Sequence, residues 1–124
     1  MEKIAPFGKT TTRMVKTHVF FVKKADSLKT SIIGLIGAKK PQPLLFHTRF
    51  GIHTFGMSFP IDVVILDKNG IVVRQKALLL PNRIFLWPPK WNTVLELPAN
   101  SITSANIRLG EYVEIRYKSF KKIT

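Results

Sequence analysis

Asp62 is the carboxylate whose placement points most directly to chemistry, because it lies inside the apolar run Ile61–Leu66. Burying an unpaired charge is costly, so this position requires either a partner or a task. As a functional group, Asp62 would act as a general base or as a ligand. As a structural group, it would accept backbone N–H groups or pair with Arg83 or Arg49. We expect the structural role, since isolated buried acids mostly belong to the scaffold.

Glu96 is the second candidate acid. It alternates with Leu95 and Leu97 in a strand-like segment. Together, Asp62 and Glu96 would form the acid pair that glycoside hydrolysis needs, with a separation of about 5–10 Å. The pair requires both carboxylates to be accessible from one cavity.

Two histidines raise the question of a metal site. If Phe50-Gly51 forms a turn, His47 and His53 would meet across a hairpin. With Asp62 or Glu96 they would resemble a two-histidine, one-carboxylate centre. No local ligand signature accompanies them and the chain has no cysteine. We therefore expect neither a metal nor a cofactor.

The segment 80–91, LPNRIFLWPPKW, combines aromatic, basic and proline residues. Aromatic rings in a proline-rich loop beside cations stack on bases or sugar rings. We therefore predict a ligand site formed by Arg83, Trp87, Lys90 and Trp91. The alternative is a lid whose tryptophans pack over one barrel mouth, since large aromatic side chains are mostly buried.

Charge and composition limit the classes of protein. The 124 residues include 20 Lys and Arg against 7 Asp and Glu, a net charge of +13. Such a surface attracts polyanions, although a lysine-rich solvated surface explains the excess more simply. No apolar run approaches the roughly 20 residues that span a bilayer. With no apolar signal core at its start either, the chain is predicted to be cytoplasmic.

Strand-like patterns must position these residues. They cover residues 14–23, 44–49, 52–55, 61–66, 71–76, 93–97 and 111–118, with a helix at 28–35 and a loop or helical turn at 99–107. The segment 61–66 is apolar on both faces apart from Asp62, and Asn69-Gly70 predicts a hairpin turn after it. The fold class is all-β: a compact single-domain β-barrel or jelly-roll-like sandwich with one short helix. Residues 13–118 form this domain, between a basic arm at 1–12 and a basic tail at 119–124.

Four motifs, FGMSFPIDVVILDKNGIVV, LLLPNR, VLELPANS and LGEYVEI, occur in this order along the chain. They resemble the domain-of-unknown-function 192 family over roughly residues 15–117. The resemblance implies a compact β-barrel or jelly-roll-like sandwich and does not imply a particular activity. One departure is Asn100, where the family usually has glycine. Asparagine tolerates the left-handed conformation, so we expect the turn to survive.

These observations favour a small cytoplasmic binding module without catalysis. Its ligand would be anionic or ring-bearing and held by the aromatic and basic loop. Two alternatives stay open: a carboxylate-dependent hydrolase that uses Asp62 and Glu96, and a basic protein that binds nucleic acid. Nothing in the sequence indicates the oligomeric state.

Overall fold

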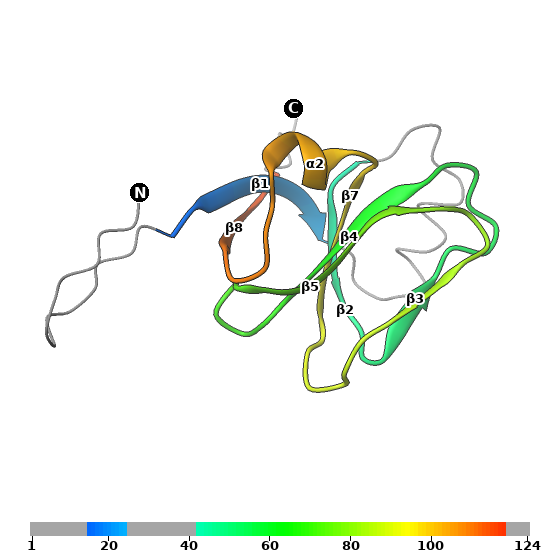
Figure 1. The fold of residues 1–124 in the computed structure, drawn as a ribbon, viewed down its shortest axis with the longest axis horizontal. Coiled ribbons are helices and arrows are strands. Elements are labelled where there is room, and N and C mark those ends of the chain that lie inside the picture. The colour runs from blue at the N-terminus through cyan, green and yellow to red at the C-terminus, as the bar shows by residue number, and fades with distance from the viewer. Residues whose placement is uncertain (1–14, 25–41, 119–124) are drawn as a thin grey trace, which may run out of the picture.

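The computed structural model describes residues 15–24 and 42–118, and these form two β-sheets and a short helix (Figure 1). The larger sheet has six strands in the order β5-β4-β7-β2-β1-β8, and β3 pairs with β6 in a separate two-stranded ribbon. The bounds are β1 Thr17–Lys24, β2 Leu44–His47, β3 Gly51–His53, β4 Ile61–Leu66, β5 Val72–Leu79, β6 Ile84–Leu86, β7 Thr93–Pro98, α2 Ser101–Ala105 and β8 Tyr112–Tyr117. The predicted helix at 28–35, the arm at 1–12 and the tail at 119–124 lie outside the described residues.

β4 is the buried strand that its composition predicts, since all six of its residues are buried. It pairs antiparallel with β5 on one side and with β7 on the other. The turn into β5 is held by Asp67, whose Oδ1 accepts the amides of Asn69 (2.8 Å) and Ile71 (2.9 Å). Gly70 has φ +83°, and a Cβ there would lie 2.9 Å from the Tyr112 ring, so glycine is required.

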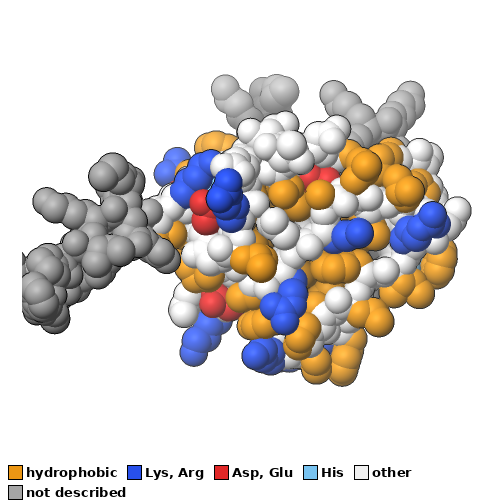
Figure 2. Space-filling model, in the orientation of Figure 1, with side chains coloured by type: hydrophobic (Ala, Val, Ile, Leu, Met, Phe, Trp, Pro, Cys, Tyr) orange, Lys and Arg blue, Asp and Glu red, His pale blue; other side chains and the backbone are white. Residues whose placement is uncertain are grey.

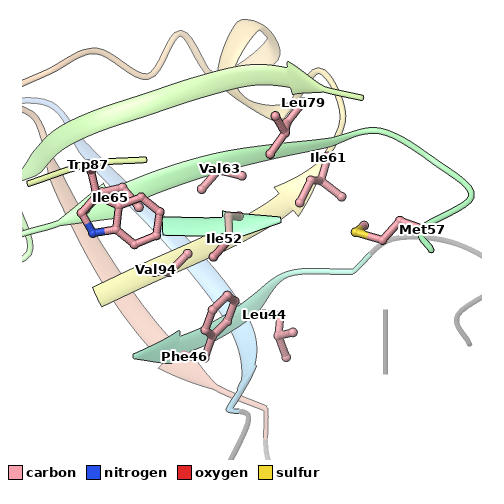
Figure 3. Close-up of a cluster of buried hydrophobic side chains, with 10 residues drawn as sticks. All are labelled: Leu44, Phe46, Ile52, Met57, Ile61, Val63, Ile65, Leu79, Trp87 and Val94. Atoms are coloured by element: carbon pink, nitrogen blue, oxygen red, sulfur yellow. The ribbon is translucent and has the colours of Figure 1, made fainter. Parts of the chain in front are cut away.

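The larger sheet has an apolar core on each face, because successive side chains of a strand point in opposite directions. Ile61, Val63 and Ile65 of β4 belong to the first core, whereas Val64 and Leu66 belong to the second. The inner face of the β3–β6 ribbon covers the first core and contributes side chains to it (Figure 3). Helix α2 and β8 contribute to the second core. The described chain is therefore a layered all-β domain.

The six-stranded sheet curls until its two edge strands touch at one end (Figure 1). The Val72 amide donates to the carbonyl of Glu111 (2.9 Å), and the Val113 amide donates to the carbonyl of Gly70 (2.8 Å). β1 pairs with β8 in parallel over six residues of each strand. These contacts give the half-closed barrel that the strand pattern predicts.

Two local predictions need correction. The segments 44–49 and 52–55 do not form a hairpin, because β2 pairs with β7 and β1 while β3 pairs with β6. The segment 80–91 contains a strand, β6, where we expected only a proline-rich loop. None of the helices within the described residues has the length and hydropathy that a bilayer crossing requires.

Candidate functional site

Asp62 is sealed from solvent, with an exposed fraction of 0%. Its Oδ1 accepts the amide of Leu78 and its Oδ2 accepts the amide of Ile102, each at 2.8 Å. Arg49 and Arg83 instead donate to backbone carbonyls on either side of β6. Of the roles considered for Asp62, the structure selects the acceptor of backbone amides.

Each of these two amides lies where regular secondary structure provides no backbone acceptor. Helix α2 begins after Asn100, which is left-handed (φ 75°) as expected and gives no side-chain cap, so Asp62 caps the helix through Ile102. On β5 the register shifts, because Ile61 faces Leu79 while Val63 faces Lys76. Two residues of β5 therefore lie opposite Asp62, and this extra residue makes a β-bulge. Asp62 holds this bulge and the start of the helix together.

Glu96 lies on the other face of the sheet. It faces Val63 of β4 and Leu44 of β2, both members of the first core, whereas Asp62 faces Leu97 of the second core. Residues paired across strands point to the same face, so the sheet itself separates the two carboxylates. They do not form the acid pair that the hydrolase alternative requires.

The surroundings of Glu96 favour its neutral form. The residue is 4% exposed, and desolvation by burial raises the pKa of its carboxyl to about 8. Within the part of the chain that the structure describes, its Oε2 has no hydrogen-bond partner. At this pKa the protonated form predominates at neutral pH.

His47 and His53 lie on different sheets and do not meet. His47 is exposed on β2, and its Nδ1 lies 3.4 Å from Thr93 Oγ1. The ring of His53 stacks on Phe55 with centroids 5.0 Å apart, and its Nδ1 accepts the Phe55 amide at 3.3 Å. Residues 15–24 and 42–118 contain no group of three potential metal ligands.

The predicted loop site of Arg83, Trp87, Lys90 and Trp91 does not form one surface, because its residues lie partly in the core and partly at opposite ends of β6. Trp87 is a core residue, 5% exposed, and its Nε1 donates to the carbonyl of Trp91 at 2.8 Å (Figure 3). Trp91 is half-buried, with the cations of Arg74 and Lys90 at 4.8 and 4.5 Å from the centre of its ring. Arg83 is exposed at the other end of β6. Trp87 thus behaves as the lid alternative expects and offers no face to a ligand.

The opposite face of the same segment is open. Along β6 and the residue that follows it, Phe85 and Trp87 point to the core, whereas Ile84 and Leu86 are exposed. β3 alternates in register with them: Ile52, which faces Phe85, is buried, and the pairs Gly51–Leu86 and His53–Ile84 lie on the outer face. The ribbon therefore has an inner face in the core and an outer face in contact with solvent.

A hollow of about 290 Å³ occupies this outer face, and we refer to it as the ribbon hollow. Gly51 forms its floor, since a Cβ there would lie 2.5 Å from Leu86 Cδ2 and 2.6 Å from the Phe85 carbonyl oxygen. The walls are apolar, and Arg49 and His53 add the polar groups. The lining residues are Arg49, Phe50, Gly51, Ile52, His53, Phe55, Ile84 and Leu86.

Thr54 connects the ribbon to the next loop. It is fully buried, and its Oγ1 donates to the carbonyl of Leu80 (2.6 Å) and accepts the amide of Arg83 (2.9 Å). Its backbone carbonyl accepts the amides of Met57 (3.2 Å) and Asn82 (3.1 Å). Sequence analysis missed this role, because a single threonine at the end of a strand carries no distinctive pattern.

The charges of the described residues are unevenly distributed. Arg49 and Arg83 lie beside the ribbon, and no carboxylate from residues 15–24 or 42–118 lines the hollow. The carboxylates that are not buried, Asp67, Glu111 and Glu114, lie in the β4–β5 turn and along β8. Figure 2 shows apolar and basic side chains gathered over the part of the surface where β3 lies. This region is therefore both apolar and positively charged.

Comparison with known proteins agrees with this architecture. A protein of unknown function from Novosphingobium aromaticivorans DSM 12444 is similar over 90% of this chain and 91% of its own, with 11% identity and a TM-score of 0.61. A proposed transcription regulator from Sinorhizobium meliloti 1021 is similar over 73% of this chain and 78% of its own, with 16% identity and a TM-score of 0.65. At such identities the similarity shows the fold alone.

A search of curated proteins finds no match. The model of the family DUF192, described as uncharacterised ACR, matches residues 9–115, which is most of the chain. This match agrees with the motif order noted in the sequence: the chain belongs to the DUF192 family.

Proposed function

We propose that this chain is a non-catalytic binding protein whose ligand places an apolar or ring-shaped body in the ribbon hollow. The observation that carries the proposal is the exposure of large apolar side chains around one cavity. Phe50 is 63% exposed, Phe55 47%, Ile84 59% and Leu86 69%. Contiguous apolar patches of this kind mark interaction sites in soluble proteins, because their exposure to water is otherwise unfavourable.

The geometry of the ribbon supports a site that exists before the ligand binds. The inner face of β6 is fixed in the core through Phe85 and Trp87, and Gly51 lets the two strands approach closely. The apolar side chains of the outer face therefore project from a rigid support, which lowers the ordering cost of binding. The proposal keeps the anionic or ring-bearing ligand expected from the sequence and transfers it to the outer face of the segment 80–91.

Cations beside the hollow favour a ligand with negative charge. Arg49 donates to the carbonyl of Pro89 at 2.6 Å, so its guanidinium is held at the rim. No carboxylate of the described residues lines the hollow to neutralise it. The separation of Asp62 and Glu96 onto opposite faces of the sheet gives no support to the hydrolase alternative. The cytoplasmic location stays a prediction.

The test uses 8-anilinonaphthalene-1-sulfonate, a fluorescent anion with aromatic rings. The substitution Leu86→Ser removes an exposed apolar wall of the hollow. We therefore expect the variant to bind the probe about tenfold more weakly than wild type, a loss of about 1.4 kcal/mol in binding free energy. Phe21→Ser is the matched control, because Phe21 is 54% exposed on β1, away from the ribbon. Equal losses in the two variants would refute the site.

The same preparation tests the nucleic-acid alternative. Binding of random-sequence DNA that weakens steeply with salt and is unaffected by Leu86→Ser would favour a basic surface over the hollow. We expect no DNA affinity beyond what the net charge of +13 provides.

A further inference from the structure

A second hollow of about 260 Å³ lies beside the ribbon hollow, and Ile84 lines both. Its other lining residues are Lys76, Leu78, Leu79, Leu80 and Arg83. The two hollows therefore share a wall on β6, although they differ in chemistry. The first has mainly apolar walls, whereas the second brings two cationic side chains together.

The second hollow is formed by two features that have no regular strand geometry. At the β5 bulge, Leu78 adopts φ 54°, and Asp62 holds its amide in place at 2.8 Å. Across the hollow, Thr54 fixes the loop that carries Leu80 and Arg83 by bonding the carbonyl of one and the amide of the other. Both walls are thus held by buried polar side chains.

The cations of this hollow are available to a ligand. Among the described residues, the guanidinium of Arg83 makes only two hydrogen bonds, both long, from Nη1 to the carbonyls of Pro81 (3.4 Å) and Asn82 (3.3 Å). Lys76 is exposed, and no ion pair between either side chain and a carboxylate forms within residues 15–24 and 42–118. A guanidinium binds a carboxylate or phosphate through two parallel hydrogen bonds, and an ammonium adds a point charge.

We propose that the second hollow binds the anionic group of the molecule whose apolar body fills the ribbon hollow. The ligand is then a single amphiphilic anion, a carboxylate or phosphate joined to a ring or an aliphatic chain. Each hollow alone is below the common range for ligand pockets, about 300–1,000 Å³, and the two together lie within it. This inference rests on the proposed function and specifies the ligand class of that site.

The test compares 4-phenylbutanoate with its uncharged amide, 4-phenylbutanamide, by calorimetric titration. We expect the wild type to bind the carboxylate about tenfold more tightly than the amide. In the variant Lys76→Gln, Arg83→Gln this preference disappears while amide affinity is unchanged. Lys68→Gln is the matched control, since it removes one positive charge from the distant β4–β5 turn. It retains the preference.

The outcomes separate the two proposals. If both compounds bind equally and Leu86→Ser weakens both, the ribbon hollow stands and the anion subsite is refuted. If neither compound binds, the proposed function fails with it. If the protein sediments with phosphatidylglycerol vesicles but does not bind free 4-phenylbutanoate, the surface serves a membrane and the inference is overturned. A loss of preference in Lys68→Gln equal to that in the double variant would reduce the effect to net charge.

Discussion

Asp62 and Glu96 are both buried carboxyl groups in the six-stranded sheet, yet their surroundings are opposite. Asp62 accepts two backbone amides at 2.8 Å, on the face that α2 covers. Glu96 lies on the face that the ribbon covers, and its pKa is raised to about 8. One carboxylate therefore satisfies groups that would otherwise lack partners, whereas the other is accommodated by staying protonated. Burial alone does not indicate what an acid contributes.

The largest effect is expected for Asp62→Asn, which keeps the shape of the side chain. The amide can accept only through its oxygen, so one of the two backbone N–H groups faces an NH₂ and loses its partner. We expect the free energy of unfolding to fall by about 3 kcal/mol, measured by urea denaturation at pH 7. A loss below about 1 kcal/mol would show that water or a rearranged backbone replaces the carboxylate.

A smaller effect of opposite sign is expected for Glu96→Gln. Because the pKa of Glu96 is higher in the folded state, its unfolded form releases the proton first, and wild-type stability falls as pH rises from 4.5 to about 8. Gln cannot ionise, so we expect the variant to be more stable than wild type by about 2 kcal/mol at pH 6. At pH 4 the two proteins should melt together. A constant difference across this range would contradict the protonated state.

The smallest effect is expected for Glu111→Gln, because Glu111 is an acid near the surface whereas Asp62 and Glu96 are buried. Desolvation raises the pKa of Glu111, but hydrogen bonds from His18 and the Arg108 amide outweigh it, so the pKa lies below 4.5. The resulting stability is present above pH 4.5 and is lost as pH falls through the lower, folded-state value. Glu111→Gln should therefore lower the melting temperature slightly at pH 6 and leave it unchanged at pH 2. A larger loss of melting temperature at pH 2 than at pH 6 would contradict a lowered pKa for Glu111.

Local patterns in the sequence predicted much of the fold. The two-sided apolar pattern of Ile61–Leu66 predicted the buried central strand, and Asn69-Gly70 predicted the turn. The cost of burying Asp62 predicted that it has donors, and backbone amides were one of the alternatives considered. Such properties depend on neighbours along the chain, so composition and spacing report them.

The candidate site depends on contacts that local patterns do not report. Ile84 to Trp87 alternates between exposed and buried, but the surrounding prolines favoured a loop, and the pairing partner β3 lies far away in sequence. Once β6 is a strand, Trp87 must point inward and Leu86 outward, which divides the residues predicted to bind together. The hollow is a property of the pairing and not of any single motif.

The double role of Asp62 ties two distant parts of the chain into one cooperative unit. The amides of Leu78 and Ile102 share one carboxylate, so opening the bulge weakens the start of α2, and fraying of α2 releases the bulge. One wall of the second hollow is thus coupled to the interior of the sheet through Asp62. An exposed feature of this protein therefore depends on a carboxyl group that is completely buried.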